Sequence, residues 1–216
     1  MSAKKQMDAI LIHGMGRTPI AMSILATRLR RSGIRPHLFG YSVTFERWND
    51  CFQRLEYFIA KRVKTNEFIM IGHSLGAVLM RAMMPRLIHK PAACFLLASP
   101  TQVCKAARNF AHRPFAKLLG GEIGQLLADQ QFMESLPPMG VPAKIYAGTG
   151  GPRGHYSPFG EEPNDGVLTV NETLLPGVPI QTLPVLHTFI MNSNVVTRDI
   201  VRIATSHSTQ SKNDAG

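Results

Sequence analysis

Hydrophobic residues along this chain occur in short continuous runs rather than in strict alternation with polar residues. Six such runs predict β-strands, at residues 9–12, 37–41, 68–72, 93–98, 143–147 and 180–185. Continuous apolar character suits strands that are covered on both faces, as the strands of a parallel sheet are. We therefore expect a buried sheet rather than one with a face open to solvent.

Longer amphipathic segments separate most of these runs. They predict helices at residues 20–31, 46–64, 75–88 and 188–204. Strands that alternate with helices are typical of βαβ units. The pattern therefore predicts an α/β fold, with a mainly parallel sheet of about six strands and helices on both faces. We expect residues 1–205 to form one domain, and the polar residues 206–216 to form a disordered tail.

One segment departs from this alternation. Residues 101–140 separate two predicted strands by more than one helix requires. The segment has an apolar side that includes Phe110, Phe115, Leu118 and Leu119, and it has basic residues on its other faces. Two interpretations stay open: a helix that covers the sheet, followed by a loop, or a cap or lid over a functional site.

A serine lies where a predicted strand meets a predicted helix. The residues are Gly72-His73-Ser74-Leu75-Gly76, a Gly-x-Ser-x-Gly sequence of the kind called a nucleophile elbow. The tight turn leaves little room for neighbouring side chains, which explains glycines two positions before and after the serine. The helix that follows places free N–H groups where negative charge develops. The alternative is a tight turn without chemistry.

A nucleophilic serine needs a base, and three histidines follow it beyond the central strands: His155, His187 and His207. His155 lies in a Gly/Pro-rich loop, and His207 lies in the polar tail. His187 directly follows the last predicted strand, at the edge where sites of open α/β sheets gather. We therefore favour His187 as the base.

The base in turn needs an acidic partner. The candidates in the preceding loop are Glu161, Glu162, Asp165 and Glu172. Asp165 precedes a glycine and an apolar run in "PNDGVLTV", so a turn should hold its carboxylate in place. The two adjacent glutamates have the character of an exposed loop, and Glu172 lies in a polar stretch. We favour Asp165.

Acyl transfer also needs hydrogen-bond donors for an oxyanion. The first predicted strand ends in His13-Gly14-Met15-Gly16, and this loop can present the Met15 N–H beside the N–H of Leu75. A phosphate-binding loop is the alternative, but the Gly-x-x-x-x-Gly-Lys-Ser/Thr pattern is missing from the sequence. We expect His13 to hold the loop rather than to act as the base.

Four segments together, "HGMG", "GHSLG", "NDGVLTV" and "LHTFIMNS", resemble the α/β-hydrolase superfamily and, within it, the small lipases and esterases. The resemblance covers residues 8–204. It implies Ser74 as nucleophile, Asp165 as acid and His187 as base, with Met15 and Leu75 as oxyanion donors. It also implies cleavage of carboxylic esters through an acyl-enzyme, with no metal or organic cofactor. Acyl transfer, thioester cleavage or a non-catalytic binding module are the alternatives.

The charge of the chain adds little to this picture. There are 24 Lys and Arg against 14 Asp and Glu, a formal net charge of +10. The basic residues are scattered apart from Arg28, Arg30, Arg31 and Arg35, and no nucleic-acid-binding motif accompanies them. We expect a small-molecule or lipid ester as substrate and no nucleic acid as partner, and contact with a membrane surface stays open.

The cysteines and the apolar runs indicate a compartment. The chain has three cysteines, an odd and sparse set that favours a reducing environment. Its first apolar run is too short for the apolar region of a signal peptide, and no stretch is long enough to span a membrane. We expect a cytoplasmic protein.

Overall fold

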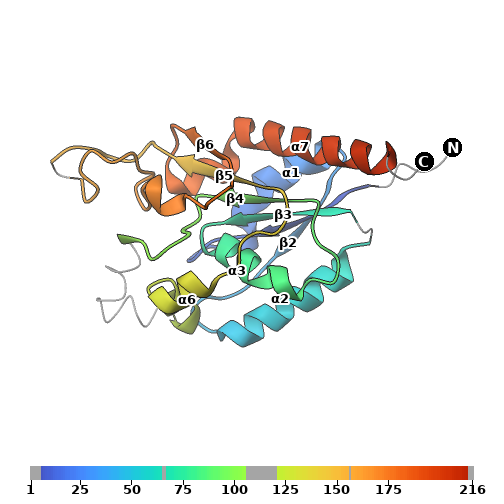
Figure 1. Ribbon diagram of the computed structural model, residues 1–216, viewed down its shortest axis with the longest axis horizontal. Coiled ribbons are helices and arrows are strands. Elements are labelled where there is room, and N and C mark those ends of the chain that lie inside the picture. Colours follow the sequence, from blue (N-terminus) through green and yellow to red (C-terminus); the bar gives the residue numbers. More distant parts are fainter. Residues whose placement is uncertain (1–5, 65–66, 106–120, 156, 214–216) are drawn as a thin grey trace.

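A parallel sheet of six strands forms the centre of the computed structural model, which describes residues 6–64, 67–105, 121–155 and 157–213 (Figure 1). The strands lie in the order β2-β1-β3-β4-β5-β6. Their bounds are β1 (Asp8–Ile12), β2 (Arg35–Phe39), β3 (Phe68–His73), β4 (Ala93–Leu97), β5 (Ala143–Gly148) and β6 (Ile180–Leu183). Each strand pairs with its neighbours in parallel.

The helices cover both faces of this sheet (Figure 1). On one face lie α1 (Ser23–Arg31) and α7 (Asn194–Asn213). On the other lie α2 (Trp48–Arg62), α3 (Leu75–Met83) and α6 (Gln130–Ser135). Four 3₁₀ segments join the described elements: η1 (Pro19–Met22), η2 (Met84–Arg86), η3 (Asn171–Thr173) and η4 (His187–Asn192). The predicted fold class is confirmed.

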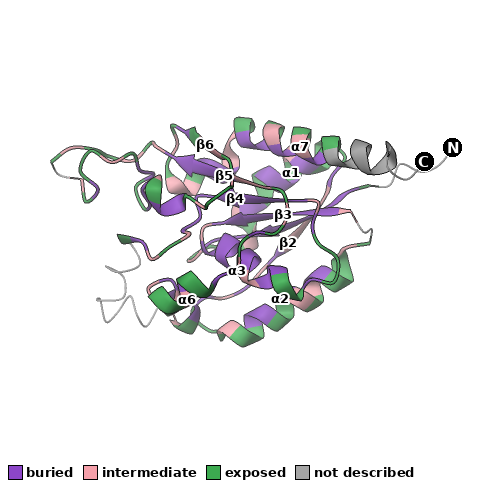
Figure 2. Cartoon of the chain, viewed as in Figure 1, coloured by how far each residue is buried: buried purple, intermediate pink, exposed green. Residues whose placement is uncertain are grey.

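Burial explains the continuous apolar runs of the sequence. Every residue of β1, β3 and β4 is buried (Figure 2). Successive side chains of a strand point to opposite faces. Ile10 therefore packs into the core beneath α2 and α3, whereas Leu11 packs into the core beneath α1 and α7. Full burial of each such side chain contributes about 1.5–3 kcal/mol, so the sheet is stabilised from both sides.

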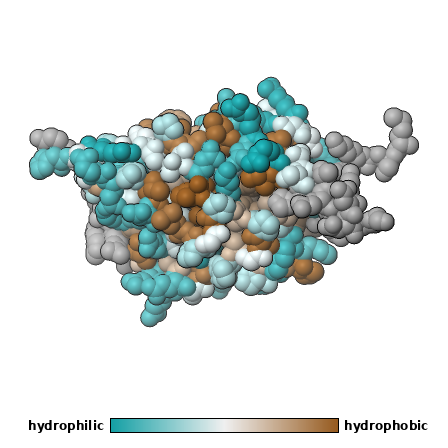
Figure 3. Space-filling model, turned by 45° about the horizontal axis from the view of Figure 1, so that its top comes forward, coloured by the Kyte–Doolittle hydropathy of each residue, from teal (hydrophilic) through white to brown (hydrophobic). Residues whose placement is uncertain are grey.

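The surface is less apolar than the two cores but not purely polar. Figure 3 shows one face, on which hydrophobic side chains lie among hydrophilic ones. Exposed large side chains include Ile20, Phe45 and Ile88. Much of the surface of any folded protein is apolar, so single exposed side chains of this kind need no special explanation.

Several boundaries differ from the predicted ones. Helix α3 ends at Met83 because Pro85 has no N–H with which to continue it, and η2 follows. Strand β2 begins at Arg35 because this residue pairs with Asp8 in the sheet register. Helix α7 continues to Asn213, beyond the predicted helix end at residue 204, and the disordered tail stays a prediction. Neither Gly nor Pro interrupts the sequence of this helix.

The predicted cap segment is described only in part. Residues 121–126 are helical, and α6 follows them. The Phe132 ring of α6 meets Trp48 of α2 edge-on, with a centroid distance of 5.0 Å, which ties this region to the helical layer. Residues 106–120, with Phe110, Phe115, Leu118 and Leu119, lie outside the described residues, so the cap stays a prediction.

Candidate active site

Ser74 occupies a strained turn at the carboxyl end of β3. Its backbone has φ 50° and ψ −123°, a conformation that residues with a side chain rarely adopt. A Cβ at Gly72 would lie 2.4 Å from the Cα of Ala77, and one at Gly76 would lie 2.3 Å from the carbonyl oxygen of Ile12. Both glycines are therefore required by close backbone contacts, as the sequence pattern predicts.

Asp165 and His187 form a hydrogen-bonded pair. The Nδ1 atom of His187 lies 2.7 Å from Oδ2 of Asp165, and the His187 N–H donates to the Asp165 carbonyl at 2.9 Å. The other carboxylate oxygen, Oδ1, accepts from the N–H groups of Val167 and Leu168 at 2.9 and 2.7 Å. The turn thus holds the carboxylate so that it orients the imidazole ring.

The other acidic candidates are engaged elsewhere. Glu161 is exposed, and Glu162 pairs with Lys105 at 2.9 Å. Glu172 is buried, and its carboxylate accepts from Thr169 and from the Lys105 N–H at 2.6–3.1 Å. Its place in a polar stretch of sequence gave no sign of this burial. Its bonds tie the loop that carries Asp165 to the start of the predicted cap segment.

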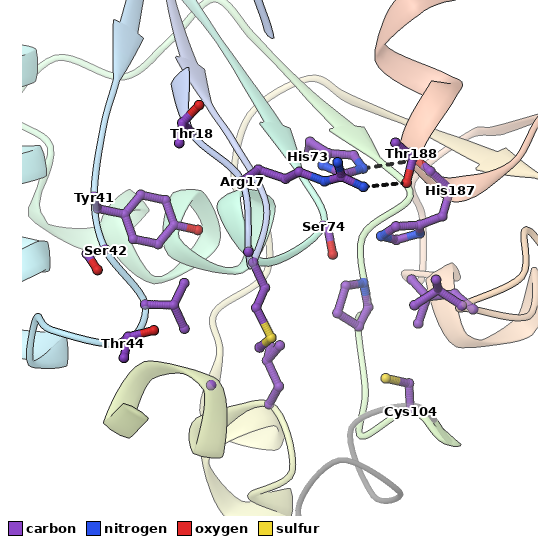
Figure 4. A pocket seen from close by; sticks show the side chains of 18 residues that line it. Arg17, Thr18, Tyr41, Ser42, Thr44, His73, Ser74, Cys104, His187 and Thr188 are labelled. Atoms are coloured by element: carbon purple, nitrogen blue, oxygen red, sulfur yellow. Dashed lines mark hydrogen bonds between the residues drawn. The ribbon is translucent and has the colours of Figure 1, made fainter. Parts of the chain in front are cut away.

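Ser74 and His187 line one cavity of about 650 Å³ (Figure 4). Their side chains come from different loops at the carboxyl edge of the sheet. Within the described residues, no hydrogen bond joins the Ser74 hydroxyl to the His187 ring; such bonds often tighten only when substrate is bound. The other lining residues are Met15, Gly16, Arg17, Thr18, Tyr41, Ser42, Val43, Thr44, His73, Pro100, Cys104, Gly124, Leu127, Val167, Leu168 and Thr188.

Of the two predicted oxyanion donors, Met15 lines this cavity and Leu75 directly follows Ser74, which also lines it. Leu75 is the first residue of α3, where a helix has no internal acceptor for its N–H. Met15 lies in the loop after β1 and lines the cavity. A Cβ at Gly14 would lie 2.8 Å from the His73 Nδ1 and 3.0 Å from the Ser74 Cβ, so this loop packs directly on the elbow.

His13 holds the loop after β1. Its Nδ1 atom lies 2.9 Å from the carbonyl oxygen of Gly14, and its ring stacks on Tyr41 with a centroid distance of 4.5 Å. The Tyr41 hydroxyl donates to the His13 carbonyl at 2.9 Å. Burial lowers the pKa of His13, which favours a neutral ring. These contacts agree with a loop-fixing role.

His73, the residue before the serine, is one that the sequence pattern did not single out. Its Nε2 atom lies 3.1 Å from the His187 carbonyl oxygen, and the two rings lie 5.0 Å apart. Since a carbonyl only accepts, Nε2 is the donor. Burial, aided by the nearby His187, lowers the pKa of His73 to about 3, so the ring stays neutral. A histidine at the end of a buried strand was the available signal, because buried polar groups need partners.

Arg17 is a second residue that the sequence pattern did not single out. Its Nη2 atom donates to the Thr188 hydroxyl at 2.8 Å, next to His187 (Figure 4).

Over the described ranges, no three His, Cys, Asp or Glu side chains are grouped so that they could hold a metal ion. In the same part of the chain, no helix is both long and apolar enough to cross a membrane.

A parallel sheet with a serine elbow and an Asp–His pair at its carboxyl edge is the architecture of an α/β hydrolase. The model of the alpha/beta hydrolase family matches residues 9–199, and the chain belongs to this family. No significant match was found among curated protein sequences.

Solved structures with a similar fold include three with different described activities. The mature lipase BlEst2 of Bacillus licheniformis has 16% sequence identity and a TM-score of 0.71, over 94% of each chain. A pyrethroid hydrolase of Sphingobium faniae JZ-2 has 14% identity and a TM-score of 0.64, over 93% of this chain and 98% of that one. Tomato methylketone synthase I, as its H243A variant, has 10% identity and a TM-score of 0.59, over 95% of this chain and 100% of that one. At these identities the likeness shows the fold alone.

Proposed function

We propose that the protein is a serine hydrolase that cleaves carboxylic esters through an acyl-enzyme. One observation carries this proposal: Ser74 lies on a strained elbow in the same cavity as His187, and His187 is bonded to Asp165 at 2.7 Å. A serine that is a poor nucleophile by itself is activated by such a base. The fold's lipase and pyrethroid hydrolase neighbours are consistent with this chemistry.

In the first half-reaction, Ser74 Oγ attacks the ester carbonyl while His187 Nε2 accepts its proton. The carbonyl oxygen becomes an oxyanion, which the N–H groups of Leu75 and Met15 stabilise. Asp165 keeps Nδ1 of His187 protonated and stabilises the imidazolium that forms. The imidazolium then protonates the leaving alcohol as the C–O bond breaks, and the acyl group stays on Ser74.

In the second half-reaction, water replaces the alcohol. His187 removes a proton from the water as its oxygen attacks the acyl carbon, and the same two N–H groups stabilise the new oxyanion. His187 then returns the proton to Ser74, and the carboxylic acid is released. The sum is ester plus water to acid plus alcohol, and no further reactant is required.

The cavity wall favours an apolar acyl group. Met15, Val43, Leu127, Val167 and Leu168 line it, and it has the volume of a small-molecule site. Each buried methylene contributes about 0.8 kcal/mol to binding. Acyl chains longer than acetate should therefore be preferred until the cavity is full.

Labelling with a fluorophosphonate probe tests the nucleophile. The parent protein should be labelled, whereas Ser74→Ala should not, and His187→Ala should be labelled far more slowly because its serine has no base. The matched control is Ser32→Ala, an exposed serine at the end of α1, which should be labelled like the parent. Labelling of Ser74→Ala at the parent's rate would exclude Ser74 as the nucleophile.

A substrate panel distinguishes the alternatives that share this triad. Matched oxygen esters and thioesters of the same acyl chain, with and without a competing alcohol as acceptor, separate ester hydrolysis from thioester cleavage and acyl transfer. We expect the free acid as the main product from the oxygen ester. A protein that is not labelled and turns over none of these substrates would be a binding module instead.

A further inference from the structure

The cavity beside Ser74 contains one fixed positive charge. Among the described residues that line it, Arg17 is the one Arg or Lys, and none is an Asp or Glu. Its Nη2 donates to the neutral hydroxyl of Thr188 at 2.8 Å. In the described part of the chain, no carboxylate pairs with its guanidinium. Arginine has five N–H donors, so most remain available to a ligand.

The nearby carboxylates do not satisfy this charge. Asp165 is buried, and both of its oxygens are engaged, with His187 and with the N–H groups of Val167 and Leu168. Residues 106–120, which the structure does not describe, contain two arginines and one lysine in their sequence but no Asp or Glu. Among the described lining residues, the cavity therefore has one positive charge and no negative one.

A cation at this place is unfavourable for the proposed base. In the proposed reaction positive charge develops on the His187 ring, next to Thr188, the residue that Arg17 contacts, and like charges repel. The charge of Arg17 is felt inside the site: burial is the main reason that the pKa of His73 falls, and Arg17 lowers it further. A substrate that carries a negative charge would offset this repulsion when it binds.

The position of Arg17 indicates which part of a substrate it would meet. The imidazolium must reach the leaving oxygen to protonate it, so the alcohol portion of an ester lies on the His187 side. Arg17 is hydrogen-bonded to Thr188, the residue that follows His187 in the chain. Figure 4 shows the Arg17 side chain reaching toward His187. The apolar residues Val43 and Leu127 line the cavity elsewhere and suit the acyl portion.

We propose that Arg17 selects esters whose alcohol portion carries an anionic group close to the ester bond. A guanidinium binds a carboxylate or phosphate through two parallel hydrogen bonds, which fixes orientation as well as charge. This inference rests on the proposed serine hydrolase function and names a substrate class for it. The reaction itself is unchanged, because the anionic group takes part in no bond that forms or breaks.

The test compares two butanoate esters. One is 3-butanoyloxy-4-nitrobenzoate, and the other is 2-nitrophenyl butanoate, which lacks the carboxylate. For Arg17→Gln, the ratio of kcat/KM for the charged over the neutral ester should fall about three- to tenfold below that of the parent. Arg17→Lys should retain most of the ratio because it keeps the charge. Added salt at about 0.5 M should lower the ratio in the parent but not in Arg17→Gln.

The control is Arg30→Gln, which removes the same charge from an exposed position near the end of α1, at the opposite edge of the sheet. Its ratio should equal the parent's. A ratio that is unchanged in Arg17→Gln overturns the inference, whether both activities are retained or both fall equally. An equal fall of kcat/KM for both esters would mean that Arg17 supports the reaction itself or the structure of its loop, and not the choice of substrate.

A binding measurement decides the matter if neither ester is turned over. The product 3-hydroxy-4-nitrobenzoate should slow fluorophosphonate labelling of Ser74 more than 2-nitrophenol does, and this difference should vanish in Arg17→Gln. Equal protection by the two compounds overturns the inference. The two proposals fail separately: labelling of Ser74→Ala overturns the hydrolase, whereas an unchanged ratio in a Ser74-dependent enzyme overturns the anion preference alone.

Discussion

At the scale of single residues, the backbone of Ser74 combines a function with a cost. A φ of 50° is sterically unfavourable for any residue with a Cβ, and such strain costs about 1–3 kcal/mol. The strain is retained because the turn raises the hydroxyl out of the sheet, next to the free N–H groups of α3. The surrounding glycines and the parallel strands hold the turn in place.

This strain can be measured with two inactive variants. Ser74→Gly should be more stable than Ser74→Ala by about 1 kcal/mol, because glycine adopts a positive φ without a steric penalty. Chemical unfolding of both proteins gives the difference directly. An alanine variant as stable as the glycine variant would mean that the turn stores no strain in solution.

His73 belongs to the same scale. Its neutral ring donates to the carbonyl of His187 at 3.1 Å, so it helps to hold the residue that we assign as base. His73→Gln places an amide N–H near the position of Nε2, whereas His73→Met has no donor. We expect kcat for butanoate esters to fall about tenfold in His73→Met with KM within about twofold, because small displacements of a base are costly.

The glutamine variant supplies the control for this prediction, since it should recover most of the lost kcat. Equal losses in the two variants would assign His73 a packing role only. Measuring KM beside kcat separates a displaced base from a damaged cavity.

The residues that sequence analysis proposed for the site share one property, which is that each closely follows a strand or lies in a turn with special backbone needs. Ser74 directly follows β3, His187 lies shortly after the end of β6, and Asp165 lies in a turn. Arg17 and His73 act through contacts with Thr188 and His187, more than 100 positions away along the chain. Such contacts leave no local pattern, because they depend on how the loops meet in space.

At the scale of elements, α7 is fastened to the sheet by an ionic cluster. Asp199 of α7 accepts from Tyr146 of β5 at 2.8 Å and from Arg202 at 2.6 Å, and it pairs with Lys144 of β5. Burial alone would raise the pKa of Asp199, but the hydrogen bonds from Lys144, Arg202 and Tyr146 outweigh it and lower the pKa to about 2. The carboxylate form therefore stabilises the docked helix.

A pH dependence follows from this shift. The pKa of Asp199 in the folded chain lies below its ordinary value of 3.8, so its contribution is fully present above about pH 4 and is lost as the pH falls toward 2. Asp199→Asn should lower the free energy of unfolding by about 2 kcal/mol at pH 7. The difference between parent and variant should shrink between pH 4 and 2, as urea unfolding at each pH can show. A difference that stays constant would mean that this charge does not hold the helix.

The elements with long, regular patterns are those that the sequence predicts well. All six strands and the helices α1, α2 and α3 lie where buried runs and amphipathic periods indicate. The 3₁₀ segments η1 and η4 are too short to show a period, so they merge with α1 and α7 in the sequence pattern. The predicted end of the last helix, at residue 204, was wrong because a polar composition alone does not stop a helix that contains no Gly or Pro.

At the scale of the whole molecule, the two edges of the sheet have different tasks. The carboxyl edge carries the candidate site, and the amino edge carries a buried carboxylate. Asp8 accepts from Arg35 at 2.6 and 3.0 Å, lies 2.8 Å from the His37 Nε2, and accepts from the Lys64 N–H at 2.9 Å. These bonds join the starts of β1 and β2 to the chain just after the end of α2.

Breaking this cluster should separate stability from activity. Asp8→Asn should lower the free energy of unfolding by about 1–2 kcal/mol, because the amide nitrogen of the variant cannot accept the hydrogen bonds that one carboxylate oxygen receives. Turnover per folded molecule should stay within about twofold of the parent, since the cluster lies at the far edge of the sheet. Urea unfolding and ester hydrolysis on one preparation give both values. A strong loss of turnover in a fully folded variant would contradict the division between the two edges.

The strain at Ser74 also has an evolutionary consequence. A single nucleotide change converts a serine codon of the AGC or AGT kind into a glycine codon, and glycine suits a φ of 50° better. In a lineage that no longer needed the hydroxyl, mutation and selection for stability would both move this position toward glycine. A serine kept at a position that favours glycine is what selection for a hydroxyl there would produce, as the proposed nucleophile requires.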